Sequence, residues 1–178
     1  MERELQAAFD DIEAQRIRLI GSVRTMTPAQ QEFRPAEASW CVLDVIQHLV
    51  LSEEQFLAYG RKKASAAPEA PTLTSRALAA AVVAFMKSPL RVKAPVASVL
   101  PREVVPLADL APRWEAARDG LRALVAGLPR ERLGKVLFKH PVAGKITALS
   151  GLEFFFAHVG HYLGQIARIK EAPGFPRA

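Results

Sequence analysis

"AHVGHYLGQIARI", residues 157–169, is the stretch that decides the fold class of this chain. Its apolar residues recur every three or four positions, a spacing that places them on one side of an α-helix turning ~100° per residue. The pattern extends back to about residue 147 and predicts a last helix over residues 147–170. The predicted core face of this helix is formed by Leu152, Phe155, Val159, Tyr162, Ile166 and Ile169. Three polar residues, His158, His161 and Gln165, interrupt an otherwise apolar segment and therefore suggest a functional role.

Three further segments have the same helical periodicity and are long enough to span a domain. They cover residues 2–23, 39–63 and 109–125, with Ser39 and Asp109 as predicted N-caps of the second and third. A shorter alanine-rich helix is predicted over residues 74–87, capped by Thr74 or Ser75. Four long amphipathic helices predict an all-α fold, a four-helix bundle formed as one domain by residues 1–178.

The connections between these helices are of unequal length. Thr27 and Pro28 are typical of an N-cap followed by a proline in the first turn of a short helix. Prolines 89, 95, 101 and 106 exclude a regular helix over residues 88–107 and predict a long proline-rich crossover. Residues 127–146 are interpreted as a turn-rich link.

Composition excludes several classes of protein. Half of the 178 residues are hydrophobic and 24% are charged, as in a soluble globular domain. No apolar run reaches the ~20 residues of a membrane span, and the charged start of the chain argues against a secretory signal peptide. The single cysteine, Cys41, cannot form an intramolecular disulfide and is expected to be a small core residue. A cytoplasmic location follows as the expectation.

The net charge of +6 is concentrated in residues 61–102, which contain eight Lys or Arg and one acidic residue, Glu69. This segment is either a solvated basic connection, the reading we favour, or a patch that attracts an acidic partner. Phe85 is its only aromatic residue, and no nucleic-acid-binding motif accompanies it. These features argue against nucleic acid as a partner.

Counting around the helices brings the polar residues together. His158 falls beside Tyr162 on the flank of the core face, whereas His161 lies ~60° further round. On the second helix one line contains Cys41, Val45, His48, Ser52, Gln55 and Tyr59. If the two helices are neighbours, His48 and His158 point into one pocket, as metal ligands, as a proton-transfer pair or as the polar edge of the packing. Asp44 either accepts the second imidazole N–H of His48 or is exposed to solvent.

Three segments together carry a resemblance to a known family. They are "SWCVLDVIQHL" (39–49), "HPVAGKIT" (140–147) and "HVGHYLGQIARIK" (158–170). In order and spacing they resemble the DinB/YfiT-like superfamily over nearly the whole chain. The resemblance implies a bundle of up-down-down-up topology, often a homodimer. Many members bind a divalent metal through three histidines, one on the second helix and two at i, i+4 on the last. Characterised relatives include thiol-dependent transferases and a mycothiol-dependent isomerase.

Carried over by position, His48 matches the ligand of the second helix and His158 the first ligand of the last. The third ligand would fall at position 162, where this chain has tyrosine, and His161 is a displaced substitute on another line of the helix. Three histidine nitrogens and a water make an open zinc or nickel site. Two histidines and a phenol make a weaker one, because the phenol must lose a proton with a pKa of ~10.

Two functions therefore compete at the sequence level. The first is a hydrolase or thiol S-transferase that uses zinc, nickel or iron held by His48, His158 and either Tyr162 or His161. The alternative is a metal-free, non-catalytic dimeric bundle that binds a small molecule, with Gln165 in the same polar cluster.

The state of the pocket, open or filled by Phe155 and Tyr59, distinguishes the two functions. His140 is expected chiefly to order the turn before the last helix, with a place at the pocket mouth as the second possibility. Trp40 is expected to pack the start of the second helix.

Overall fold

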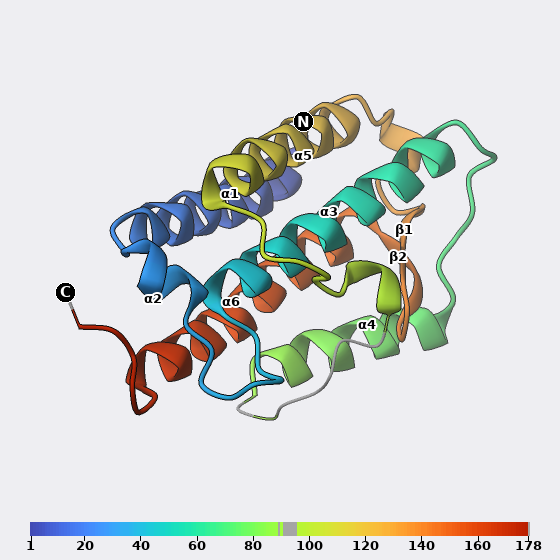
Figure 1. The fold of residues 1–178 in the computed structure, drawn as a ribbon. Coiled ribbons are helices and arrows are strands. Elements are labelled where there is room, and N and C mark those ends of the chain that lie inside the picture. The colour runs from blue at the N-terminus through green and yellow to red at the C-terminus, as the bar shows by residue number, and fades with distance from the viewer. Residues whose placement is uncertain (89, 91–95, 178) are drawn as a thin grey trace.

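The computed structural model describes residues 1–88, 90 and 96–177 and is predominantly helical (Figure 1). Its four long helices are α1 (Arg3–Arg24), α3 (Val42–Ala64), α5 (Leu107–Ala126) and α6 (Ala148–Glu171). Helix α3 packs mainly against α5, and α1 packs mainly against α6. The predicted four-helix bundle is confirmed.

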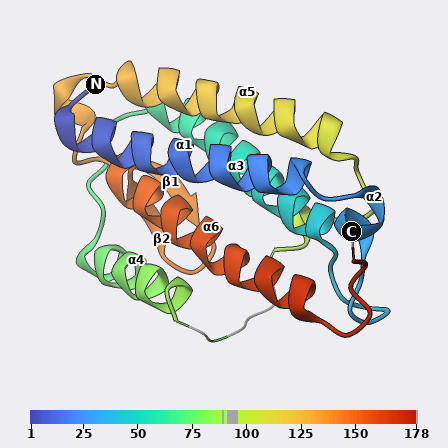
Figure 2. The ribbon, with the colours of Figure 1, turned by 90° about the vertical axis from the view of Figure 1, so that its left-hand side faces the viewer.

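The helix directions follow the up-down-down-up order that the family resemblance implies (Figure 2). Helices α3 and α5 run parallel to each other, and α1 and α6 run the opposite way. Because α3 and α5 are parallel neighbours, the chain must return along the bundle between them. Helix α4 (Leu73–Met86) makes this return against α6, and a short 3-10 helix, η1 (Ala97–Val99), follows before α5. Prolines 89 and 95 of the predicted crossover lie outside the described residues.

Local capping sets the helix starts. Helix α6 begins directly after Thr147, whose side chain accepts a hydrogen bond from the N–H of Ser150. Thr27 forms a complete capping box with Gln30 at the start of α2 (Pro28–Glu32), as its sequence predicts.

Helix α3 begins three residues later than predicted, at Val42. Ser39 does not cap it, because its hydroxyl accepts a hydrogen bond from the N–H of Ala36 in the preceding turn. The cap is instead Cys41, whose backbone N–H donates to the Asp44 carboxylate at 2.9 Å. As expected, Cys41 is a fully buried core residue, and burial raises the pKa of its thiol.

Two further helix starts differ from the prediction. Helix α4 is capped by Thr72 rather than by Thr74 or Ser75. Helix α5 begins after Pro106, so that Asp109 lies in its first turn and Pro112 in its second. Proline at the boundary holds an extended backbone, and an acidic residue in the first turn remains favourable to the helix dipole.

The link predicted over residues 127–146 contains structure that the helical pattern did not predict. After a short 3-10 helix, η2 (Arg130–Arg132), strands β1 (Val136–His140) and β2 (Gly144–Thr147) form an antiparallel hairpin. Gly144 has a φ of 71°, a left-handed conformation that glycine adopts readily. The predicted all-α fold is confirmed, and the described residues add to it one small two-stranded sheet.

The hairpin is fixed to the bundle by Phe138, which is completely buried. A Cβ atom at Gly60 would lie 2.7 Å from the Phe138 ring, and one at Gly151 only 2.4 Å. The ring thus requires a residue without a side chain on both α3 and α6. This packing places the hairpin at the end of α3 and the start of α6.

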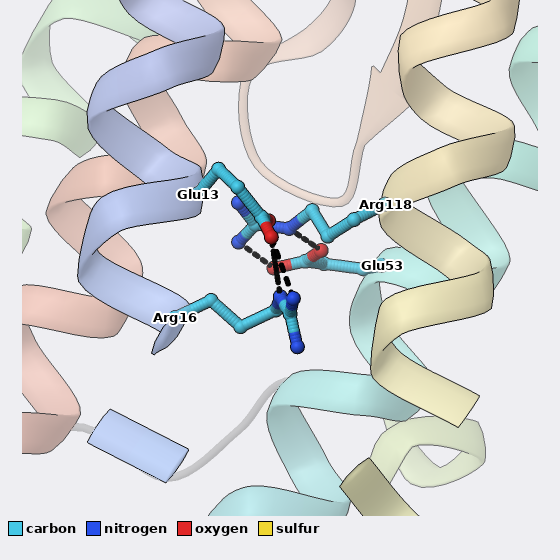
Figure 3. Close-up of polar contacts among 4 residues, drawn as sticks. All are labelled: Glu13, Arg16, Glu53 and Arg118. Carbon is cyan, nitrogen blue, oxygen red and sulfur yellow. Dashed lines mark hydrogen bonds and ion pairs between the residues drawn. The ribbon is translucent and has the colours of Figure 1, made fainter. Parts of the chain in front are cut away.

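Four charged residues lie among the packed helices on the α1 and α5 side (Figure 3). The Arg118 guanidinium of α5 donates to both carboxylate oxygens of Glu53 on α3, at 2.5 and 2.6 Å, and both side chains are buried. Arg16 pairs with Glu13 within α1, and this hydrogen bond is the main reason that the pKa of Glu13 is lowered.

Among the described residues, none of the helices combines the length and the apolar content needed to cross a bilayer.

Candidate functional site

The largest feature of the site is a cavity of about 760 Å³. It lies between α3, α4 and α6, with the hairpin and η1 completing its wall. Its polar lining includes His48, Ser52, Gln55, Tyr59, Lys139, His140, His158, His161 and Tyr162. Apolar side chains from α4, among them Leu78, Val82 and Phe85, supply much of the remaining surface.

His48 and His158 meet in this cavity from facing helices. The Nδ1 atom of His48 lies 2.8 Å from the carbonyl oxygen of Val99, and its Nε2 atom lies 3.3 Å from Nε2 of His158. A carbonyl can only accept, so we assign the proton of neutral His48 to Nδ1. His158 then donates its Nε2–H to His48. The two imidazoles and the η1 carbonyl form one hydrogen-bonded chain.

The buried groups of this wall are held in their neutral forms. Burial lowers the pKa of His48, and it lowers that of His158 well below the ordinary value, because transfer from water penalises the imidazolium. Burial also raises the pKa of Tyr162 to about 12. At neutral pH the wall therefore presents two imidazoles and a phenol, all uncharged.

Tyr162, rather than His161, accompanies the histidine pair. The Tyr162 ring centroid lies 4.8 Å from that of His48 and 5.0 Å from that of His158. The His161 ring lies against the backbone of Met86 at the end of α4. His161 is separated from the pair because it lies on a different line along α6, as counting around the helix predicted.

Trp40 packs against two residues of the cavity wall without lining the cavity itself. Its ring stacks on Tyr162 with a centroid distance of 6.1 Å and an interplanar angle of 15°. It also lies 5.1 Å from the His48 ring. Trp40 thus packs the start of α3, as predicted, and in doing so restricts the movement of two cavity residues.

Two residues predicted to belong to the site lie elsewhere. Asp44 is neither a partner of His48 nor exposed, because its buried carboxylate accepts from the N–H of Cys41 and pairs with Arg34 at 2.6 Å. It is a capping residue of α3. Gln165 is half-buried on α6, but it is not part of the cavity lining.

His140 takes both of the positions considered for it. Its Nδ1 atom accepts hydrogen bonds from the backbone N–H groups of Val142 and Ala143, each at 3.1 Å, and so orders the turn of the hairpin. Its ring also lines the cavity beside Phe154, with a centroid distance of 4.6 Å. Burial lowers the pKa of His140 to about 4.

The sequence did not predict the parts of the cavity wall that come from η1, β1 and α4. Tyr59 lines the cavity without filling it, and Phe155 packs in the apolar core instead. Val99, Lys139 and the apolar side of α4 were not predicted to take part. The sequence did contain one signal for α4, because this helix has more apolar side chains than the bundle buries.

The donor set does not fit a three-ligand metal centre. Two nitrogens bound to one tetrahedral zinc at 2.0–2.1 Å would be about 3.3 Å apart, which is the separation of the two Nε2 atoms. However, the described residues contain no group of three His, Cys, Asp or Glu side chains arranged to hold an ion. The remaining candidate, Tyr162, has a pKa of about 12 and keeps its proton. The site therefore offers two ligands where open catalytic sites use three.

A helical bundle with a crossover between parallel helices and a histidine pair facing a cavity defines the class of this protein. The chain belongs to the DinB superfamily, whose family model matches residues 11–166. No curated protein has a significantly similar sequence.

Among solved structures, the fold is similar to that of YfiT from Bacillus subtilis. The TM-score is 0.65 at 16% sequence identity, over 99% of this chain and 91% of YfiT. YfiT is described as a probable metal-dependent hydrolase with an unusual four-helix bundle topology. At this level of identity the similarity shows the fold.

Proposed function

We propose that this chain binds a largely apolar small molecule in the cavity between α3, α4 and α6, without a complete metal centre. The observation that carries the proposal is the cavity of about 760 Å³, whose wall contains a histidine pair already joined by a hydrogen bond. Cavities of this size, mostly apolar with a few polar groups, are typical of small-molecule sites.

The neutral wall determines how a ligand would be held. Since both nitrogens of His48 are engaged, its role is to orient His158 rather than to carry charge. Tyr162 and Gln55 add a hydroxyl and an amide to the lining, each of which can donate and accept. Orientation by hydrogen bonds, with affinity from apolar contact, is the recognition that this lining supports.

A metal-dependent hydrolase or thiol S-transferase is the second candidate. It is favoured by the 3.3 Å separation of the Nε2 atoms and by the description of YfiT. In that case His48 and His158 would be two of the ligands of zinc, nickel or iron, with the Tyr162 phenol as the third. The neutral state of Tyr162 makes this the less favoured function.

The test of the proposed function is binding of an uncharged apolar dye, Nile red, followed by fluorescence. The variant Ala81→Phe adds a large side chain to the α4 wall of the cavity. We expect it to weaken dye binding at least tenfold, whereas Ala77→Phe, on the same helix but outside the lining, leaves binding unchanged. Equal binding by wild type and both variants would contradict the proposal.

A further inference from the structure

The charge of the cavity lining is unbalanced. The part of the lining that the structure describes contains no aspartate or glutamate, and Lys139 is the one lysine or arginine in it. The lining histidines have lowered pKa values and are neutral, each chiefly because of burial. Such a lining accepts a neutral or anionic molecule and disfavours a cation.

Lys139 occupies a position where a second positive charge faces it. In the hairpin register it lies opposite Lys145, and like charges at such positions repel each other. Lys145 is compensated by Glu69, with which it makes a 2.7 Å ion pair. Among the described residues, no ion pair includes Lys139. An anion bound at Lys139 would relieve this repulsion.

The cavity is elongated, and Lys139 lies towards one end of it. Its lining on α3 runs from His48 to Tyr59, a rise of roughly 16 Å along the helix. The neighbouring Phe138 packs against Gly60, which places β1 near the Tyr59 end. The histidine pair and Val99 lie towards the other end. Between them α4 contributes a continuous apolar wall formed by Leu78, Ala81, Val82, Phe85 and Met86.

The sequence segment that contributes α4 to the cavity also has a positive net charge, like Lys139. Residues 61–102, which carry a net charge of +7 in the sequence, include the end of α3, the whole of α4 and η1. Of the described basic residues in this segment, Lys63 is paired with Glu69. The described part of the segment has six basic residues and Glu69, a net charge of +5, on elements next to the cavity, and positive charge there raises the local concentration of anions.

We propose that the cavity binds an elongated apolar monocarboxylate of the fatty-acid type. The carboxylate pairs with the Lys139 ammonium, and the hydrocarbon chain lies along α4 towards the histidine pair. This inference rests on the proposed function, because it names the ligand class of the same cavity.

The experiment is displacement of Nile red by dodecanoate and by dodecanol, at pH 8, below the critical micelle concentration of dodecanoate and below the solubility limit of dodecanol. The two probes share the hydrocarbon chain and differ in charge. For the wild type we expect dodecanoate to displace the dye at an about fivefold lower concentration, the size expected for one partly exposed ion pair. Lys139→Met should remove this preference without changing the affinity for dodecanol. Lys170→Met, with the same change of net charge in the last turn of α6, should retain it.

The outcomes separate the two proposals. If dodecanoate and dodecanol displace the dye equally, or if Lys139→Met leaves the preference intact, the assignment of the carboxylate to Lys139 is overturned while the small-molecule cavity stands. If neither compound displaces the dye and Ala81→Phe does not affect dye binding, the cavity itself is not a binding site. Both proposals then fail.

Discussion

Helix α3 presents two different polar surfaces to its neighbours. Towards α5, Glu53 forms a buried ion pair in which Arg118 donates to both of its carboxylate oxygens (Figure 3). Towards α4 and α6, only five residues away, His48 is neutral and lines an open cavity. A buried carboxylate whose two oxygens are both hydrogen-bonded to an arginine has a structural role in the packing of the helices. Neutral polar groups beside empty volume are instead available to a ligand.

The difference extends to the packing around each surface. On the α5 side, Leu110, Trp114 and Leu121 are almost completely buried. On α4, only Ala79 is buried among fourteen residues, and Leu73 remains 83% exposed. The four long helices thus form the stable part of the molecule. Helix α4 is less deeply buried than the long helices, and part of its apolar surface lines the cavity while Ala79 and Val83 pack on the core.

The largest expected effect comes from breaking the ion pair. Arg118→Met leaves the Glu53 carboxylate buried without its partner, and we expect a loss of about 3–5 kcal/mol in the free energy of unfolding. Urea unfolding measures it. The double variant Glu53→Met and Arg118→Met should recover most of the loss. If the single variant lost less than the double, Glu53 would not depend on Arg118 for its burial.

Acid pH is the next largest perturbation. His140 has a pKa of about 4 in the folded protein and an ordinary value of 6.5, so the unfolded state binds the proton more readily between these values. The stability contributed by neutral His140 is present above pH 6.5 and lost as pH falls through about 4. The difference corresponds to about 3 kcal/mol.

Urea midpoints at several pH values between 4 and 7.5 test this dependence. In His140→Asn the amide oxygen can replace Nδ1 as acceptor, but the side chain does not titrate. The fall in stability should be smaller in this variant without disappearing, because burial also lowers the pKa of His48 and His158. An identical fall in both proteins would show that His140 is not buried in its neutral form.

We expect an intermediate loss of stability where the Phe138 ring of the hairpin packs against α6. Gly151→Ala places a Cβ atom 2.4 Å from the Phe138 ring, which is enclosed between α3 and α6. We expect a cost of about 1–3 kcal/mol, as for overpacked cores. Gly134→Ala is the control, since a Cβ atom there meets nothing within 4 Å. Thermal unfolding of the two variants should differ clearly, and equal stability would contradict the close approach of Phe138.

The smallest effect is expected at α4. Val82 is half-buried beside the cavity, so Val82→Ala should cost less than about 1 kcal/mol, because little packed volume is lost. Leu110→Ala, in the core next to α3, should cost about 2–5 kcal/mol. If the two losses, measured by urea unfolding, were similar, the contrast between the two sides of α3 would be wrong.

The sequence predicted the long helices because their apolar periodicity reflects burial on one face. Helix α6 begins within one residue of its predicted start, since Thr147 is a strong cap with no competing partner. The start of α3 was misplaced because Ser39 has a local alternative in the preceding turn, which helical counting cannot reveal. The hairpin was missed because its two short strands have irregular burial, and because the helix breakers Pro141 and Gly144 lie at the turn that joins them.

The candidate site was predictable in part for the same reason. Counting along two helices placed His48 and His158 on faces that meet, and it placed His161 on a different line. The contacts of Val99 and Lys139 depend on where the crossover and the hairpin fold back, which no helical period encodes. The partner of Asp44 was misjudged because Arg34 lies in an irregular segment before α3.

The most direct measurement is the zinc content of untagged protein, by elemental mass spectrometry after incubation with the ion, for wild type, His48→Ala and Tyr162→His. We expect well under one equivalent of zinc in the wild type and in His48→Ala. We expect about one equivalent of zinc in Tyr162→His, where a third imidazole joins the histidine pair. One equivalent of zinc in the wild type, lost in His48→Ala, would contradict a metal-free site and favour the metal-dependent enzyme.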